Sequence, residues 1–386
     1  MAEPVLTIEG LSVDYEVGAG RFQALRDVSL TVPTGRVVGI VGETGCGKST
    51  LAHSVARLFP EPPARIVGGR IRFQGIDILE LPKWRLPEIR GTGIGMIFQE
   101  PLNSLNPSFR VYDQVAEAVK IRRFRDEFGK PIGSPARAGA PFDYSKPPRE
   151  PRSVAAELAK PLLPGGPVAA AAKRPRESKE VREEVLEYLR LVRINDPETI
   201  LGLYPHELSG GMRQRIMIAM ALSEKPALLV ADEPTSALDV TIQAQVLTLM
   251  KELIEEVHAS ILFISHDLGV IAETADELGV MYAGHLVEYG PVEEIFQRPR
   301  HPYTKALLRA IPDRYKSEGE LLTIPGSVPN LSRPPAGCTF HPRCPLVQPI
   351  CRSDPSPPLR SLDEGRMVLP PHRSACHFAE QVGQLP

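Results

Sequence analysis

Residues 42–50 read Gly-Glu-Thr-Gly-Cys-Gly-Lys-Ser-Thr, a stretch that fits the phosphate-binding pattern G-x-x-x-x-G-K-[ST]. In such a loop successive backbone N–H groups cradle a chain of phosphates, and glycines are needed because a Cβ atom would intrude. Lys48 is expected to reach the β- and γ-phosphates, and the Ser49 hydroxyl to hold Mg²⁺. The sequence therefore predicts a triphosphate site made by Gly42, Glu43, Thr44, Gly45, Cys46, Gly47, Lys48, Ser49 and Thr50.

The segments on either side of this loop strengthen the prediction. Residues 36–41 form a β-branched run of strand length, and residues 51–58 are compatible with a helix. The helix that should open near Lys48 would add the positive end of its dipole to the phosphate site. A chance match would rarely fall between a strand and a helix, so a plain glycine-rich turn is the minority interpretation.

The bulk composition restricts the class of protein. The chain has 386 residues, which is enough for two or three domains with a large core. Its formal net charge of −2 argues against general binding to polyanions. No apolar run approaches the roughly 20 residues that cross a bilayer, and the N-terminal Met-Ala-Glu-Pro lacks the basic and apolar parts of a signal peptide. These features predict a cytosolic protein.

Short apolar runs of buried-strand length alternate with helical patterns along the chain. The strand-like runs include residues 94–99, 228–232 and 261–265, and a helix is expected from about 242 to 257. Such alternation predicts an α/β fold with a largely parallel sheet.

A helical insertion is expected to interrupt this sheet at about residues 106–225. Within it, residues 181–192 carry apolar side chains at helical spacing with charges between them. Residues 122–179 are instead rich in Pro, Ala, Gly and basic residues, and are expected to be partly mobile because they can bury little apolar surface. A solvated linker is favoured there over contact with anionic lipid, and the role of this segment stays open.

Two further segments suit nucleotide chemistry. The apolar run 228–232 ends in Asp232 and is followed directly by Glu233. Beside the phosphate loop, Asp232 would hold Mg²⁺ through water, and Glu233 could polarise an attacking water. Residues 209–211, Ser-Gly-Gly, precede a helical stretch, where a hydroxyl and free backbone N–H groups form an anion site.

The stretch Leu208–Arg215, read with its surroundings, resembles the signature motif of ABC-transporter ATPases. The resemblance spans about residues 5–290 and implies that family's fold, a P-loop ATPase core with antiparallel N-terminal strands and an inserted helical subdomain. It also implies ATP and Mg²⁺ as ligands. Four further positions match family motifs in the right order, namely Tyr15 for stacking on adenine, Gln99 in the glutamine loop, Asp239 in the D-loop and His266 as the switch histidine.

The resemblance implies a role for each matched residue. The residues implied to be catalytic are Glu233, His266 and Gln99, and those implied to hold Mg²⁺ are Ser49, Gln99 and Asp232.

The resemblance also implies partners. In that family one nucleotide is sandwiched between the phosphate loop of one subunit and the signature of another, so Ser209, Gly210 and Gly211 would contact the partner's ATP. This chain has one phosphate loop and one signature, so a second homologous ATPase subunit is expected, in a heterodimer. With no membrane span of its own, the chain is also expected to work with two separate transmembrane permease subunits.

Two C-terminal stretches resemble one particular branch of this family. His301–Thr304 and Gly337–Pro345 look like the C-terminal region of oligopeptide/dipeptide importer ATPases, and Ser104–Pro107 points the same way. The chain is thereby divided into an ATPase domain, 1–290, and a C-terminal region, 291–386. The resemblance implies ATP-driven peptide import with an extracytoplasmic solute-binding protein, and a peripheral position on the cytoplasmic face of the membrane.

The rival interpretation is a soluble ABC ATPase that acts on nucleic acid or ribosomes. Such proteins commonly carry tandem ATPase units or long coiled-coil insertions, and this chain has neither. The near-neutral charge also disfavours it, and no nucleic-acid partner is expected.

Four of the five cysteines, Cys338, Cys344, Cys351 and Cys376, lie in the last fifty residues. Their spacing matches neither a C-x₂-C zinc pair nor a ferredoxin run. A Pro-rich tail with little core of its own nevertheless needs a cross-link, which thiolate–metal bonds supply. The family resemblance implies a [4Fe–4S] cluster. Zinc with help from His341 or His377, four unligated thiols and a redox-sensing module all stay open as alternatives.

Overall fold

The computed structural model describes residues 3–18, 20–91, 93–99, 104–128, 179–235, 259–310, 324–353, 355–362 and 370–385, with single positions between 243 and 252. Three expectations lie largely or wholly outside the described residues. They are the mobile insertion, of which 129–178 are not described, the helix at 242–257, and Asp239 of the D-loop.

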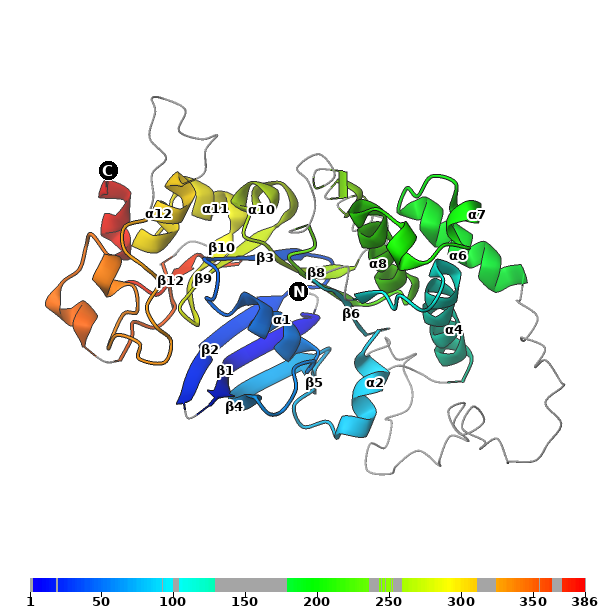
Figure 1. Cartoon of the computed structure of the whole chain (residues 1–386). Helices are drawn as coiled ribbons and strands as arrows, with labels where there is room; N and C mark the ends of the chain where they lie inside the picture. Colours follow the sequence, from blue (N-terminus) through cyan, green and yellow to red (C-terminus); the bar gives the residue numbers. More distant parts are fainter. Residues whose placement is uncertain are drawn as a thin grey trace.

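An antiparallel sheet of four strands forms the N-terminal part of the chain, drawn blue to cyan in Figure 1. In the order in which they pair, the strands are β2 (Gly20–Val32), β1 (Leu6–Val17), β4 (Ala64–Phe73) and β5 (Ile76–Asp77). Along β1 the side chains alternate, with Leu6 and Ile8 buried and Glu9 exposed, as in a sheet that turns one face to the core. The register of the first hairpin places Tyr15 opposite Phe22.

The second sheet has eight strands and forms the centre of the molecule. Its order is β11 (Arg360–Ser361), β12 (Arg373–Ser374), β10 (His285–Pro291), β9 (Glu277–Tyr282), β3 (Val37–Val41), β8 (Ser260–Ile264), β7 (Leu228–Asp232) and β6 (Ile94–Ile97). The strands from β9 to β6 run parallel. Every residue of β3, β7 and β8 is buried, as expected for a parallel sheet covered on both faces. The predicted α/β fold is confirmed.

One end of the molecule is helical (Figure 1). Its helices are α4 (Val111–Phe128), α6 (Lys179–Leu191), α7 (Pro197–Ile200) and α8 (Gly210–Ser223). The apolar positions Val181, Val185 and Leu189, whose spacing predicted a helix, are all buried on α6. Helix α8 packs on α4, α6 and strand β6. The inserted helical subdomain is thereby joined to the edge of the parallel sheet.

Shorter helices complete the fold, and their bounds are α1 (Lys48–Val55), α2 (Leu86–Ile89), α10 (Leu268–Thr274), α11 (Val292–Gln297), α12 (Pro302–Arg309) and the single-turn or short 3₁₀ helices η1 (Lys83–Arg85), η2 (Pro205–Glu207), η3 (His341–Arg343), η4 (Pro349–Arg352) and η5 (Ala379–Gln384). None of the helices in the described ranges has the length and apolar character needed to cross a membrane.

The C-terminal region lies at the end of the molecule opposite the helical subdomain (Figure 1). The sequence predicts a Pro-rich tail with little core of its own, and in the structure this region packs against the ATPase core. Strand β12 pairs with β10 and so extends the central sheet. Tyr303 and Phe340 are fully buried in the same apolar cluster as Val41 of β3. Large aromatic side chains of the C-terminal region therefore contribute to the packing against the ATPase core.

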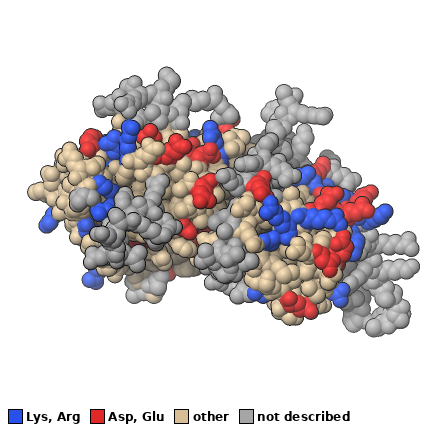
Figure 2. All heavy atoms as spheres, turned by 90° about the horizontal axis from the view of Figure 1, so that it is seen from above, with Lys and Arg blue, Asp and Glu red and all other residues tan. Residues whose placement is uncertain are grey.

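Charged side chains of both signs are intermixed on the face shown in Figure 2. That distribution agrees with the near-neutral composition of the chain. Among the described residues visible on this face, Lys and Arg do not form a continuous basic surface of the kind that binds nucleic acid.

Candidate functional site

The phosphate loop connects the buried strand β3 to helix α1, as the sequence predicts. Gly47 caps the helix with a φ of +107°, in a region that L side chains rarely adopt. A Cβ at this position would stand 2.6 Å from the carbonyl oxygen of Ala24 and 2.9 Å from a methyl of Leu25. Only glycine lets the loop pack this closely against β2.

Lys48, the first residue of α1, points its side chain back over the loop. Its ammonium donates to the carbonyl oxygen of Gly42 at 2.8 Å and lies 3.8 Å from a carboxylate oxygen of Glu233. The side chain is 5 % exposed, so its charge acts in a poorly solvated setting. This arrangement suits a cation that binds phosphate oxygens.

Asp232 ends strand β7 directly beside the start of α1. The Ser49 hydroxyl donates to a carboxylate oxygen of Asp232 at 3.2 Å. Burial raises the pKa of Asp232, while the hydrogen bond from Ser49 acts in the opposite direction. A hydroxyl and a carboxylate are oxygen ligands of the type that Mg²⁺ prefers. The pair predicted to hold Mg²⁺ therefore fits that ion.

Glu233, the next residue, brings three predicted catalytic side chains together. Its carboxylate accepts a hydrogen bond from the amide nitrogen of Gln99 at 2.8 Å, and Nδ1 of His266 lies 3.5 Å away. Its backbone has a φ of +45°, and its N–H donates to the carbonyl of Ile264 at 2.9 Å. A non-glycine residue held in this strained conformation at a polar site suggests function.

Of these groups, Lys48, Ser49, Gln99 and Glu233 line one cavity of about 340 Å³. Asp232 and His266 are not in its lining, but they lie against Ser49 and Glu233. The stacked rings of Tyr15 and Phe22 lie at one side, with centroids 5.5 Å apart. The residues that line the cavity are Tyr15, Phe22, Ala24, Thr44, Gly45, Gly47, Lys48, Ser49, Thr50, Gln99, Glu233 and Leu331. Nine of these residues, from five separate elements or loops, were predicted from the sequence.

Three lining residues were missed by sequence reasoning: Phe22, Ala24 and Leu331. A signal for Phe22 existed, because the strand hairpin that follows Tyr15 had to return an aromatic side chain beside it. Nothing in the sequence indicated Leu331, which lies in the C-terminal region. Its carbonyl oxygen accepts a hydrogen bond from Arg26 of β2 at 3.3 Å, and this contact holds the segment near the cavity.

Some predicted residues lie elsewhere. Of the described residues, Gly42, Glu43 and Cys46 belong to the loop but do not line the cavity. Cys46 is fully buried, and burial raises the pKa of its thiol, so it is an apolar packing group here. Glu43 instead turns toward the C-terminal region, as described below.

The signature residues are also separate from this cavity. Ser209 caps α8 and accepts a hydrogen bond from the backbone N–H of Met212 at 3.3 Å. Neither Ser209 nor Gly210 or Gly211 lines the cavity. A polar helix N-terminus is therefore present in the predicted place, outside the lining of the cavity that holds Lys48 and Ser49.

The four C-terminal cysteines lie close enough for their thiols to influence one another. Burial raises the pKa of Cys344 to about 11 and that of Cys376 to about 12, and the neighbouring thiols act in the same direction. In the part of the chain that the structure describes, no group of three or more His, Cys, Asp and Glu side chains is arranged to hold a metal ion. Neither the zinc nor the [4Fe–4S] expectation is confirmed by this arrangement.

The fold and the cavity together define an ATPase of the P-loop class. Residues 25–236 match the ABC transporter family, and residues 287–351 match the oligopeptide/dipeptide transporter C-terminal region. The chain belongs to the ABC transporter family, in the branch that carries this C-terminal region.

Two relatives align over nearly the whole chain. A probable peptide ABC transporter ATP-binding protein of Sinorhizobium fredii is 41 % identical over 100 % of this chain and 98 % of its own length. The dipeptide transport ATP-binding protein of Bacillus subtilis is 40 % identical over 93 % of this chain and 92 % of its own length.

One solved structure is similar in fold. The dimeric ATP-binding cassette captured after hydrolysis with ADP and phosphate has a TM-score of 0.54 and 23 % identity, and covers 74 % of this chain and 98 % of its own length. At this identity the likeness concerns the fold alone.

Proposed function

We propose that this protein hydrolyses ATP to drive the import of di- or oligopeptides. One observation supports the catalytic part above all. Lys48, Ser49, Gln99 and Glu233 line one cavity. Asp232 accepts a hydrogen bond from Ser49, and His266 lies 3.5 Å from Glu233. The import of peptides is supported by the names of the two relatives and by the match of residues 287–351.

The geometry of the cavity supports a role in ATP hydrolysis for each of these side chains. Lys48 would neutralise phosphate charge, and Ser49 and Asp232 would hold Mg²⁺, which supplies further charge neutralisation when bound. Glu233 would accept a proton from the attacking water, while Gln99 holds its carboxylate in place. His266, 3.5 Å from the same carboxylate, would contact the γ-phosphate of ATP. Tyr15 and Phe22 offer a stacked aromatic face to the adenine.

The signature supports a second ATPase subunit. Ser209, Gly210 and Gly211 form a capped helix N-terminus that lies away from the cavity of their own chain. Such an N-terminus suits the phosphates of an ATP held by another subunit. We infer a dimer of ATPase subunits, and a related chain as the partner in a heterodimer.

The described surface beside Gln99 supports contact with permeases. Phe98, next to Gln99, is 37 % exposed, and Phe109 before α4 is 52 % exposed. Exposed aromatic side chains of this kind suit a protein–protein interface. We infer two permease subunits docked near this surface at the cytoplasmic face of the membrane, with a solute-binding protein beyond them.

We also propose that Cys338, Cys344, Cys351 and Cys376 hold a [4Fe–4S] cluster. This proposal is supported by the match of residues 287–351, which include Cys338, Cys344 and Cys351, to the oligopeptide/dipeptide transporter C-terminal region. A cluster would be structural, since no electron donor is implied. Anaerobically purified protein should contain iron and acid-labile sulfide in equal amounts, and stoichiometric zinc without iron would contradict the proposal.

Reconstituted transport tests the overall function. The complex that co-purifies with a tagged copy of this chain should accumulate labelled di- and tripeptides in proteoliposomes only when ATP and Mg²⁺ are supplied. The Lys48→Ala complex serves as the matched control and should accumulate none. Co-purification with ribosomes or nucleic acid instead of membrane proteins would favour the rival function.

A further inference from the structure

Glu43 of the phosphate loop is held from outside the loop by two residues of the C-terminal region. Its backbone N–H donates to the Tyr303 hydroxyl oxygen at 2.9 Å. Its two carboxylate oxygens accept hydrogen bonds from the two terminal nitrogens of Arg343, at 2.8 and 3.2 Å. This is a bidentate, charge-assisted pair, which fixes direction as well as distance.

Arg343 is itself fixed on every side. Its side chain is 5 % exposed. Its nitrogens also donate to the carbonyl oxygens of Pro325 at 2.8 Å and Ile324 at 3.2 Å, and to the Tyr282 hydroxyl at 3.3 Å. The guanidinium lies 5.8 Å from the ring centroid of Tyr282 and 5.9 Å from that of Phe340. A side chain with so many partners can transmit a displacement, because it has little freedom to absorb one.

Tyr303 is equally constrained. It is fully buried on α12, with its ring centroid 4.6 Å from that of Tyr282 and 5.4 Å from that of Phe340. His301 caps this helix by accepting from the Tyr303 backbone N–H at 3.1 Å, and burial lowers the pKa of His301 to about 3. The cap is therefore a neutral imidazole throughout the physiological pH range.

The loop geometry near Lys48 depends on this anchor. The ammonium of Lys48 donates to the carbonyl oxygens of Gly42 at 2.8 Å and Glu43 at 3.4 Å. A shift of Glu43 would move both carbonyl groups, and with them the cation and the backbone N–H groups that face the cavity. Glu43 does not line that cavity, so its side chain is free to serve as the point of attachment.

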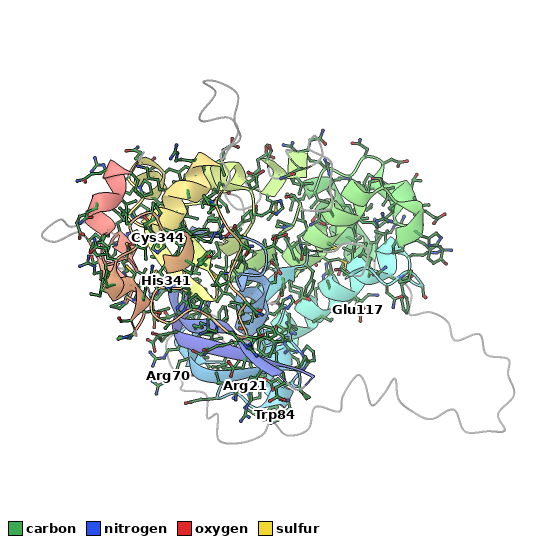
Figure 3. All side chains as sticks on the ribbon, turned by 60° about the vertical axis from the view of Figure 1, so that its left-hand side comes forward. Arg21, Arg70, Trp84, Glu117, His341 and Cys344 are labelled. Carbon is green, nitrogen blue, oxygen red and sulfur yellow. The ribbon has the colours of Figure 1, made fainter. Side chains whose placement is uncertain are left out.

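We propose that Arg343 and Tyr303 are positioning residues that hold the phosphate loop in its ATP-binding shape. The inference rests on the proposed ATPase function and deepens it. Arg343 directly precedes Cys344, which packs against the apolar cluster that contains Tyr282 and Tyr303 and is labelled close to His341 in Figure 3. The C-terminal region is thereby connected directly to the phosphate loop.

The decisive measurement is the dissociation constant of a fluorescent ATP analogue for the full-length chain with Mg²⁺. Arg343→Met and Glu43→Gln should each weaken binding about tenfold, which is the effect of ~1.4 kcal/mol. The double variant should be no weaker than the stronger single variant, because both remove the same contact. Tyr303→Phe, which keeps the ring in the core, should weaken binding roughly threefold.

The matched control is Arg190→Met, which breaks an ion pair with Glu198 on the surface of the helical subdomain. It should change the dissociation constant by less than about twofold. In steady-state ATP hydrolysis, Arg343→Met should have a raised KM and a kcat that changes less than about threefold. Partial unfolding would instead lower kcat, because fewer molecules would be active.

Three results would overturn the proposal. They are unchanged affinity in folded Arg343→Met, effects of the two single variants that multiply in the double variant, and a control as damaging as the test variants. If Arg343→Met does not fold, Tyr303→Phe and Glu43→Gln decide the question, since both preserve side-chain volume. Binding that follows these expectations in a wild-type complex without turnover would refute the ATPase function and leave the positioning role intact.

Discussion

The phosphate loop and the signature are both glycine-bearing helix N-termini, yet the structure treats them differently. At the first, Gly47 is the N-cap of α1, with a φ that favours glycine, and it packs against β2 and lines a cavity of about 340 Å³. At the second, α8 begins with an ordinary cap by Ser209, and none of residues 209–211 lines that cavity. The same local chemistry is complete within the chain in one place and incomplete in the other.

The difference teaches that tertiary surroundings, more than the motif, make a binding site. The phosphate loop has Asp232, Glu233 and Tyr15 close to it because β1, β7 and the loop itself meet at one place. Residues 209–211 of the signature are not in the lining of that cavity. If the proposed dimer is right, substitutions at the two places should fail in different assays.

The largest effect is expected on ATP turnover, from a substitution at a residue that lines the cavity. In the assembled complex, Glu233→Gln should lower ATP turnover by about 10²–10⁴-fold, because the amide cannot accept the proton of the attacking water. ATP should still bind with near-normal affinity, since Lys48 and the loop are unchanged. Turnover is measured by phosphate release, and Glu198→Gln on the exposed surface is the control. Near-normal turnover would remove Glu233 from its proposed role.

A pair of alanine variants compares the two helix N-termini directly. Gly47→Ala should weaken ATP binding by the isolated chain about a hundredfold or more, because a Cβ would meet Ala24 and the φ of +107° is strained. Gly211→Ala should leave that binding within about twofold and instead lower turnover by the complex. Binding is measured by titration with a fluorescent nucleotide. A strong binding defect in the isolated Gly211→Ala chain would contradict the proposal that the phosphate loop binds the chain's own ATP and the signature binds the ATP of the partner subunit.

The smallest effect concerns Leu331, the contribution of the C-terminal region to the cavity wall. Leu331→Ala removes apolar surface from the nucleotide face and should weaken binding by about three- to tenfold. Leu58→Ala, at a 37 % exposed position outside the cavity lining, is the matched control. Equal affinities for the two variants would show that Leu331 does not contact the nucleotide.

Prediction from sequence succeeded for features formed by residues that are close together in the chain. The loop 42–50, the acidic end of β7 and the apolar spacing of α6 are local patterns, and each folded as expected. It failed for the C-terminal region, because the burial of Tyr303 and Phe340 depends on surfaces supplied by distant segments. It also gave no sign that Glu43 of the phosphate loop contacts Tyr303 and Arg343, which lie 260 and 300 residues away in the chain.

The sequence by itself determined the class of chemistry: a phosphate loop, an acidic strand end and a signature, whose residue types suit ATP because phosphate needs N–H groups, cations and Mg²⁺ ligands. Only the tertiary structure decided which of these groups share one cavity. It brought Gln99 and His266 to Glu233, and it kept residues 209–211 apart. It also attached the C-terminal region to the loop through Arg343. Contacts between distant segments depend on how whole surfaces pack, and no short stretch of sequence encodes that.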